Sequence, residues 1–309
     1  MSSKSLYPPL KLIRSMELNY PKGFEIYEER LSHKAEDELP FDIASAVSLH
    51  FFPDSKYQEA AEVCALLLTV VGEWRKSKQV YSFSKELTDM ICDSEEALLD
   101  SNIFEYLPYP CFYLEVKDVA DIHGVFVKYI SDAANHHIIF VVICNDGTFC
   151  YNIFDLEGSS TFYTMTKKYA DEFEEAKYRD GLRKCILFAF QASVYLCAKN
   201  CDVAENPNQQ KVYKPSKSIK DKFSEIRKWD VGYRIAKEVK MTSTTPPISA
   251  GKSQSGHNRP REHWRKAHWH TYWVGPRGQQ RKELRFIAPI HVNDIGDQLP
   301  IVNHKNSEK

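Results

Sequence analysis

The sequence lacks any apolar run long enough to cross a membrane. Its most apolar stretch, Cys185–Ala198, has 14 residues and contains Gln191 and Ser193, whereas a spanning helix needs about 20 apolar residues. The first residues, MSSKSLYPPLKLIRSM, lack the continuous apolar segment of a secretory signal. We therefore expect no membrane partner, and we expect Cys185–Ala198 to form a buried helix.

Motifs for enzyme chemistry are also missing. No glycine-rich phosphate loop, G-x-S-x-G motif or C-x-x-C pair occurs in the 309 residues. The eight cysteines do not make a disulfide scaffold in a chain of this length, so we expect reduced, buried thiols. His136-His137 at a strand entrance and the acidic run Asp171–Glu175 at a helix start both have structural explanations. We predict no catalytic residue and no cofactor.

An excess of positive over negative charge is found only in the C-terminal part of the chain. The first 250 residues carry 30 basic and 37 acidic side chains, a net charge of −7. Between Gly251 and His291, nine Lys and Arg stand against two acidic residues, a net charge of +7. The same window holds three of the five Trp and five of the 11 His. Basic side chains interleaved with flat rings suit a phosphate backbone or an acidic protein surface.

The patterning predicts an α+β fold, with an antiparallel β-meander packed with helices plus a basic C-terminal β-hairpin. Helical periodicity indicates helices at about 55–76, 84–92 and 178–201, while residues 219–240 fit either a strand or a helix. Period-two alternation from Cys111 to Phe154 indicates about four strands, with a hairpin turn at Asn145-Asp146-Gly147.

The chain divides into four segments by composition. Residues 1–240 form an α+β body for partner recognition, 241–258 a Ser-, Thr-, Gly- and Pro-rich flexible linker, 259–293 the basic hairpin rich in aromatic residues and His, and 294–309 a tail. The hairpin is expected to turn at Gly275–Gly278. Because about 45 residues cannot easily sustain their own core, we expect it to dock on the body.

Alternation along the first hairpin strand separates two faces. Trp269, Thr271 and Trp273 are expected on one face, and His268, His270 and Tyr272 on the other. Basic residues and flat rings of this hairpin are candidates for contact with nucleic acid or the ribosome, through phosphate contacts and base stacking. The candidates are Arg259, Arg261, His263, Arg265, Lys266, His268, Trp269, His270, Trp273, Arg277, Arg281, Lys282 and Arg285. Two alternatives stay open: contact with an acidic protein, or a solvated hairpin whose tryptophans pack inward.

The histidine cluster raises a metal-binding alternative. His268 and His270 are two apart, so both imidazoles point the same way on a strand, and His263 is near in sequence. However, Arg265 and Lys266 repel a cation, and no Cys or well-placed carboxylate completes a ligand set. We predict no metal site; imidazoles that hydrogen-bond phosphate or backbone are the preferred interpretation.

The order of several short blocks along residues 60–293 resembles a type V-A anti-CRISPR family, carried by plasmids and phages. The most specific blocks are Arg259-Pro260, His268-Trp269-His270, Tyr272-Trp273, Lys282-Glu283-Leu284-Arg285 and Val292-Asn293. Weaker blocks upstream are Gly72-Glu73-Trp74-Arg75, Leu107-Pro108, Tyr113-Leu114-Glu115-Val116 and Leu196-Cys197. Similar basic His-Trp blocks also occur in plasmid and phage proteins of unassigned role.

This resemblance implies a non-enzymatic protein of the bacterial cytoplasm. Such a protein recognises the nascent N-terminal peptide of the type V-A effector nuclease and triggers loss of the effector mRNA. The implied partners are that peptide, the mRNA or the ribosome, and a recruited host ribonuclease. The resemblance does not mark the peptide-binding residues; addition of an extended peptide to a sheet edge is one physical route. The alternatives are a nucleic-acid-binding accessory protein without a CRISPR target, and a metal-dependent nuclease built on the His cluster.

Overall fold

The structure is a computed structural model of the chain. It describes residues 7–35, 38–94, 101–117, 119, 121–131, 136–156, 176–206, 226–237 and 263–292. The predicted linker at 241–258 and the predicted tail at 294–309 lie outside the described residues.

The body is built from helices that flank one sheet. The helices are α1 (Pro8–Asn19), α2 (Gly23–Ser32), α3 (Pro40–Phe51), α4 (Gln58–Ser77), α5 (Lys85–Cys92) and α7 (Ala176–Cys197), with 3₁₀ turns η1 (Ser55–Tyr57) and η2 (Ser101–Tyr106). The strands of the sheet are β1 (Gln79–Phe83), β2 (Cys111–Glu115), β3 (Ile122–Ser131), β4 (His136–Cys144), β5 (Phe149–Asp155), β6 (Val203–Glu205) and β7 (Arg227–Val231). None of the helices described is long and apolar enough to span a bilayer.

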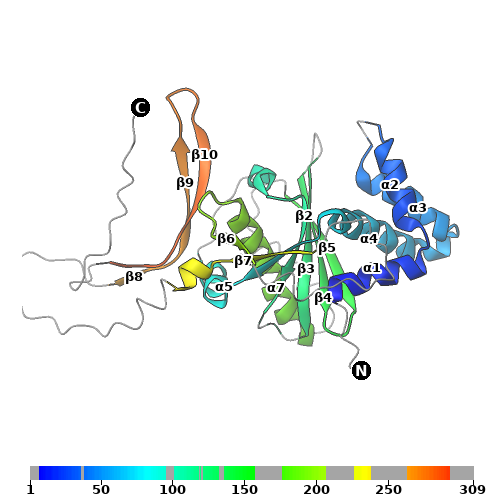
Figure 1. The fold of residues 1–309 in the computed structure, drawn as a ribbon, viewed down its shortest axis with the longest axis horizontal. Helices are drawn as coiled ribbons and strands as arrows, with labels where there is room; N and C mark the ends of the chain where they lie inside the picture. Colours follow the sequence, from blue (N-terminus) through cyan, green and yellow to red (C-terminus); the bar gives the residue numbers. More distant parts are fainter. Residues whose placement is uncertain are drawn as a thin grey trace, which may run out of the picture.

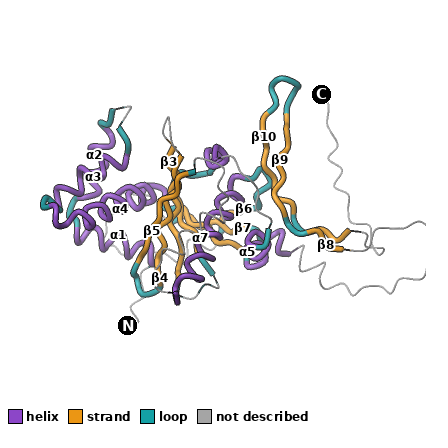
Figure 2. Tube along the Cα trace, turned by 180° about the vertical axis from the view of Figure 1, so that it is seen from behind, coloured by secondary structure: helices purple, strands orange, loops and turns teal. Residues whose placement is uncertain are grey.

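The seven strands lie in the order β5-β4-β3-β2-β1-β7-β6, between two layers of helices (Figures 1 and 2). Strands β2 to β5 form the antiparallel meander, whereas β1 runs parallel to both β2 and β7. Helices α1–α4 cover one face of the sheet, and α5 and α7 cover the other. The fold is therefore a three-layer α+β body.

Burial on both faces explains the strong apolar character of the central strands. Successive side chains of a strand point to opposite faces, so β4 supplies both helical layers at once. Three of its residues pack with the α5–α7 layer and three with the α1–α4 layer: Ile138, Phe140 and Val142, then Ile139, Val141 and Ile143. A strand covered on both faces reads as a continuous apolar run.

The predicted α+β class is confirmed, and most of the predicted elements are present. The four-stranded meander, the helices near 55–76, 84–92 and 178–201 and the turn at Gly147 (φ 92°) are all found. The predicted meander was incomplete, however, because β1, β7 and β6 extend the sheet. Residues 227–231 form a strand and 233–237 a helical turn, which resolves the ambiguity over 219–240 for the described part.

The C-terminal hairpin has two paired segments. Strands β9 (His268–Val274) and β10 (Arg281–Ile287) pair around the predicted turn, where Gly275 and Gly278 have φ of 113° and 90°. Strands β8 (His263–Arg265) and β11 (Ile290–Val292) continue the pairing beyond a bend in both arms of the hairpin. The ribbon stands at one end of the molecule, and its β9–β10 tip rises past the body (Figure 1).

Candidate functional site

The base of the hairpin is part of the body's hydrophobic core, as predicted. Trp269 of β9 is only 8% exposed, and Phe286 lies directly opposite it on β10. Their rings are 4.9 Å apart, and Phe286 packs 5.5 Å from Tyr195 near the end of α7. Leu284 completes the buried contact. Burial of this apolar area fixes one end of the ribbon on the α7 layer.

Hydrogen bonds make the docking directional. The Trp269 Nε1–H donates to Gln191 Oε1 at 3.1 Å, which satisfies two buried polar groups together. Asn200 pairs with both backbone groups of Phe286, donating to its carbonyl at 2.8 Å and accepting from its N–H at 3.0 Å. The Lys199 N–H also donates to the Leu284 carbonyl at 3.0 Å. The loop after α7 therefore hydrogen-bonds the outer edge of β10, much as a neighbouring strand would.

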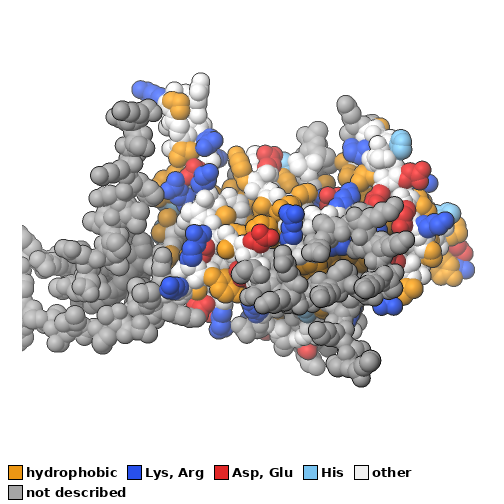
Figure 3. Space-filling model, in the orientation of Figure 1, with side chains coloured by type: hydrophobic (Ala, Val, Ile, Leu, Met, Phe, Trp, Pro, Cys, Tyr) orange, Lys and Arg blue, Asp and Glu red, His pale blue; other side chains and the backbone are white. Residues whose placement is uncertain are grey.

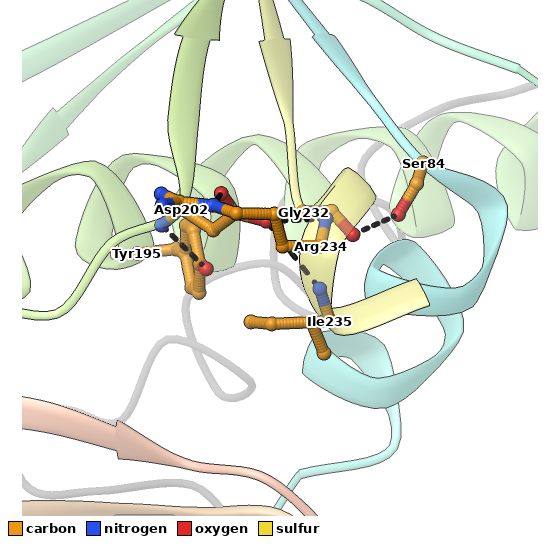
Figure 4. A network of polar contacts seen from close by, with 6 residues as sticks. All are labelled: Ser84, Tyr195, Asp202, Gly232, Arg234 and Ile235. Carbon is orange, nitrogen blue, oxygen red and sulfur yellow. Dashed lines mark hydrogen bonds and ion pairs between the residues drawn. The ribbon is translucent and has the colours of Figure 1, made fainter. Parts of the chain in front are cut away.

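Asp202 holds this receiving loop in place (Figure 4). Its carboxylate is buried and accepts from the backbone N–H groups of Arg234 at 2.7 Å and Ile235 at 3.4 Å, so it caps the helical turn at 233–237. The same carboxylate forms an ion pair with the Arg234 guanidinium. Its own N–H donates to the Tyr195 hydroxyl at 2.9 Å. The end of α7, the loop and the turn after β7 are thereby joined.

Gly232 lets the chain turn beneath this network. Its φ of 78° belongs to the left-handed region, and an added Cβ would lie 2.3 Å from Leu87 Cδ2. Its carbonyl accepts from Ser84 Oγ at 3.1 Å, and its N–H donates to the Asp202 carbonyl at 2.8 Å (Figure 4). Glycine is required here both by the backbone conformation and by the close approach of α5.

The tip of the hairpin projects beyond the core and is solvated. Trp273 lies on the same strand face as Trp269 but is 62% exposed. Lys282 is its cross-strand partner, with Nζ 5.7 Å from the centre of the indole ring. Such a pair is within cation–π range. Figure 3 shows Lys and Arg side chains gathered along this ribbon and at its tip.

The opposite face of the ribbon carries a ladder of planar groups. The rings of His270 and Tyr272 are 4.3 Å apart, and the Arg285 guanidinium lies 5.4 Å from the Tyr272 ring. Arg285 also donates from Nε and Nη2 to Glu283 Oε1, at 2.8 and 2.6 Å. The Glu283 carboxylate therefore offsets the charge of Arg285, and the Arg285 guanidinium packs against the Tyr272 ring.

The structure places the predicted contact residues in three different settings. Exposed side chains are Lys266, His270, Trp273, Arg277, Arg281 and Lys282, while His268 and Arg285 are partly covered. His263 and Arg265 lie on β8, and Arg259 and Arg261 lie outside the described residues. Burial argues against the predicted contact role of Trp269, because its ring cannot meet a base without leaving the core. Trp273, by contrast, does not pack inward as the alternative interpretation of the hairpin required.

The histidines of β9 do not form a recognisable ligand set. His268 Nδ1 lies 3.1 Å from the Lys266 carbonyl, whereas His270 packs on Tyr272. Within the part of the chain that the structure describes, no three His, Cys, Asp or Glu side chains are grouped as a metal ion would require.

A second polar cluster, which the sequence did not reveal, joins α1 to the sheet. Glu115 at the end of β2 accepts from the Tyr7 hydroxyl at 2.8 Å and pairs with Lys228 Nζ of β7 at 2.6 Å. Burial raises the pKa of Glu115, but the bonds from Lys228 and Tyr7 outweigh it and hold the pKa below its ordinary value. The charged form of Glu115 therefore ties three elements together.

His123 extends this cluster through a β-bulge. Its Nδ1 lies 2.7 Å from the Tyr113 hydroxyl, and the register of β3 shifts between Ile122 and Gly124. A Cβ on Gly124 would lie 2.3 Å from the Leu114 carbonyl oxygen, so only glycine permits the bulge. Burial lowers the pKa of His123 below its ordinary value, which nearby Lys11 and Lys228 reinforce and Glu115 opposes.

We expect acid to weaken the fold through His123 before it affects Glu115. A histidine with a lowered folded-state pKa binds its proton more readily when unfolded, so its contribution is complete above about pH 6.5 and declines below it. The Glu115 contribution declines only below about pH 4.3. Thermal unfolding midpoints measured from pH 8 to pH 5 should fall less steeply for His123→Gln than for the wild type. Exposed His50→Gln is the control; an equal change in its profile would contradict the assignment to His123.

Comparison with known proteins matches most of the chain to one family. The family model described as AcrVA2-like, the anti-CRISPR type V subtype A2 family, matches residues 81–294. A solved structure titled "Crystal structure of AcrVA2" is similar in fold, with a TM-score of 0.59 and 16% identity over 94% of this chain and 100% of that one. No curated protein matches.

Proposed function

The chain belongs to the anti-CRISPR type V subtype A2 family, and from this premise we propose that it acts on a type V-A effector while the effector is being translated. As a member of the family it is an anti-CRISPR protein of the type V-A class. Its mechanism, we propose, is recognition of the nascent N-terminal segment of the effector, followed by loss of the mRNA that is being read.

One observation carries this proposal: a basic, aromatic hairpin is docked on an acidic body. The first 250 residues, which include the body, have a net charge of −7, and packing around Trp269 holds the hairpin against α7. The exposed tip adds three basic side chains, Arg277, Arg281 and Lys282, and Lys266 is exposed at the bend before β9. This layout suits a protein whose body binds a peptide and whose hairpin meets ribosomal or messenger RNA beside it.

A recruited host ribonuclease, in this proposal, cuts the transcript. Three of the cysteines are not activated, because burial raises the pKa of Cys64 and Cys111 to about 12 and that of Cys92 to about 11. Thiols of such high pKa are poor nucleophiles at neutral pH. Action on a nascent chain also implies the cytoplasm of the bacterial host, with no cofactor and no membrane partner.

A reporter transcript assay in bacteria tests the mechanism. The protein is co-expressed with a message whose first codons encode the N-terminus of a type V-A effector, fused to an unrelated reporter. One control recodes those codons synonymously, and another shifts their reading frame. Transcript level is measured with and without the protein.

The two controls separate peptide recognition from RNA recognition. Transcript loss that survives recoding but disappears on the frameshift is the expected result, because only the peptide is then changed. Loss that follows the nucleotide sequence would replace the peptide by the message as the recognised partner. An unchanged transcript in every arm would favour the nucleic-acid-binding accessory role instead.

A further inference from the structure

The tip of the hairpin combines features that rarely occur together on a solvated surface. We call Trp273, Arg277, Arg281 and Lys282 the tip surface. Trp273 has 62% of its surface exposed, although the tryptophan four residues earlier is a core residue. Tryptophan is highly buried on average, so a solvated indole beside several cations marks a candidate contact surface. Trp273 is the second-last residue of β9, and the tip of the β9–β10 ribbon rises past the body (Figure 1).

The surroundings of Trp273 do not resemble the centre of a protein interface. On its face of the ribbon, the neighbouring exposed side chains of β9 and β10 are Thr271 and Lys282. Protein interfaces bury a contiguous apolar core inside a polar rim, and the described tip offers a single ring among polar groups. A base, in contrast, needs one flat ring to stack on and a cation beside it for the phosphate.

Charge on the tip surface favours a polyanion. Lys282 lies opposite Trp273 and shares its face, and Arg277 lies in the turn. Arg281 lies opposite Val274 at the start of β10, on the other face of the ribbon. No ion pair joins Arg277 or Arg281 to another residue that the structure describes. Arg285, on the other face, is offset by Glu283 and is therefore a poorer phosphate contact. The Trp273 face is thus the better side for a nucleic-acid strand.

The exposed ring also discriminates between single and double strands. In an A-form duplex the base faces are stacked on one another, and its deep, narrow major groove is closed to side chains. A tryptophan at the end of a narrow ribbon finds an available base face only in single strands, loops and ends. Stacking is tolerant of sequence because every base has a π-face.

We propose that the tip surface is a binding site for single-stranded RNA. Trp273 stacks on an unpaired base, Arg277 and Lys282 contact the adjacent phosphates, and Arg281 contacts the strand where it passes around the end of the ribbon. Recognition at this site depends on strandedness and little on sequence. The choice of RNA over other polyanions rests on the proposed function, since the message being translated is exposed as single strand beside the ribosome. In that mechanism, the partner of the hairpin is therefore single-stranded messenger RNA.

Binding of the purified full chain to a labelled, unstructured oligoribonucleotide tests the proposal by fluorescence anisotropy. Trp273→Ala should weaken binding by about 5- to 140-fold, the equivalent of one stacked base, and Trp273→Phe should recover part of the loss. The control is Tyr57→Ala on the far side of the sheet. Tyr57 is also well exposed, with the Lys56 ammonium 4.8 Å from its ring, and its loss should leave RNA affinity unchanged.

The same strand annealed to its complement supplies the second arm. Wild-type protein should prefer the single strand, and Trp273→Ala should reduce that preference toward the level of the duplex. Equal loss on both substrates, or no loss on either, would overturn the site. Failure of wild-type protein to bind the single strand would make the tip a protein contact. These assays contain no effector peptide, so their failure leaves the transcript assay, and hence the proposed function, independently testable.

Discussion

Trp269→Ala is expected to lower the free energy of unfolding by about 3–5 kcal/mol, the usual cost of truncating a buried aromatic residue to alanine. Three losses contribute to this value. The substitution removes the ring contact with Phe286 at 4.9 Å and leaves a cavity against Tyr195. It also leaves the buried side-chain oxygen of Gln191 without the hydrogen bond from Trp269. The hairpin should also separate from α7, because the indole is the largest group at the docking contact.

Trp273→Ala provides a matched control for this measurement. It deletes the same side chain from the same face of the same strand, four residues away, where the ring is solvated. Exposed positions of this kind usually change stability by less than about 0.5 kcal/mol. Urea unfolding of both variants should separate them clearly, and limited proteolysis should cut the hairpin faster only in Trp269→Ala. Similar stabilities for the two variants would show that the hairpin does not share the body's core.

The contrast between these two tryptophans also marks the limit of what sequence patterning can predict. Alternation correctly assigns both to one face of β9. Whether that face is buried depends on where the ribbon overhangs the body, which is a property of the tertiary structure. The signal for docking was present in the length and composition of the hairpin, but nothing in the local sequence distinguishes Trp269 from Trp273.

The sheet shows the same division between local and nonlocal information. The meander was predictable because its strands alternate and are joined by short turns such as Asn145-Asp146-Gly147. Strand β1 was missed since it is buried throughout and contains Gln79 and Ser82, so it has no period-two pattern. Its partners β2 and β7 are distant in the sequence. Helices α1 and α3 begin with Pro8 and Pro40, start signals that could have revealed them.

The polar cluster around Glu115 could not be predicted for a similar reason. Its members come from the start of α1, from β2, from the bulge of β3 and from β7. Glu115 and Lys228 are separated by more than a hundred residues and meet only because β1 lies between their strands. By contrast, the charged hairpin is contiguous in the sequence, and for that reason its composition alone marked it as the candidate site.

Replacing Arg277, Arg281 and Lys282 together by glutamine is expected to abolish transcript lowering in bacteria and to flatten the salt dependence of RNA binding. Each phosphate contact to a single strand contributes about −0.7 to the slope of log affinity against log salt, so losing three should reduce the slope by about 2. All three side chains are exposed, so the free energy of unfolding should change little. Anisotropy titrations across a salt series measure the slope, and the reporter assay measures the transcript.

A second triple variant separates local contact from the charge of the whole protein. Arg14, Arg30 and Lys34 are exposed on the α1–α2 side of the sheet, and their replacement by glutamine removes the same net charge far from the hairpin. Because the first 250 residues already carry a net charge of −7, the body should repel RNA, and this control should keep the wild-type slope apart from a small uniform loss of affinity. If both triple variants flattened the slope equally, attraction would arise from total charge, and the tip would have no phosphate contacts of its own. If only the hairpin variant lost its slope but transcripts still fell, RNA binding at the tip would be real and unnecessary for the anti-CRISPR mechanism.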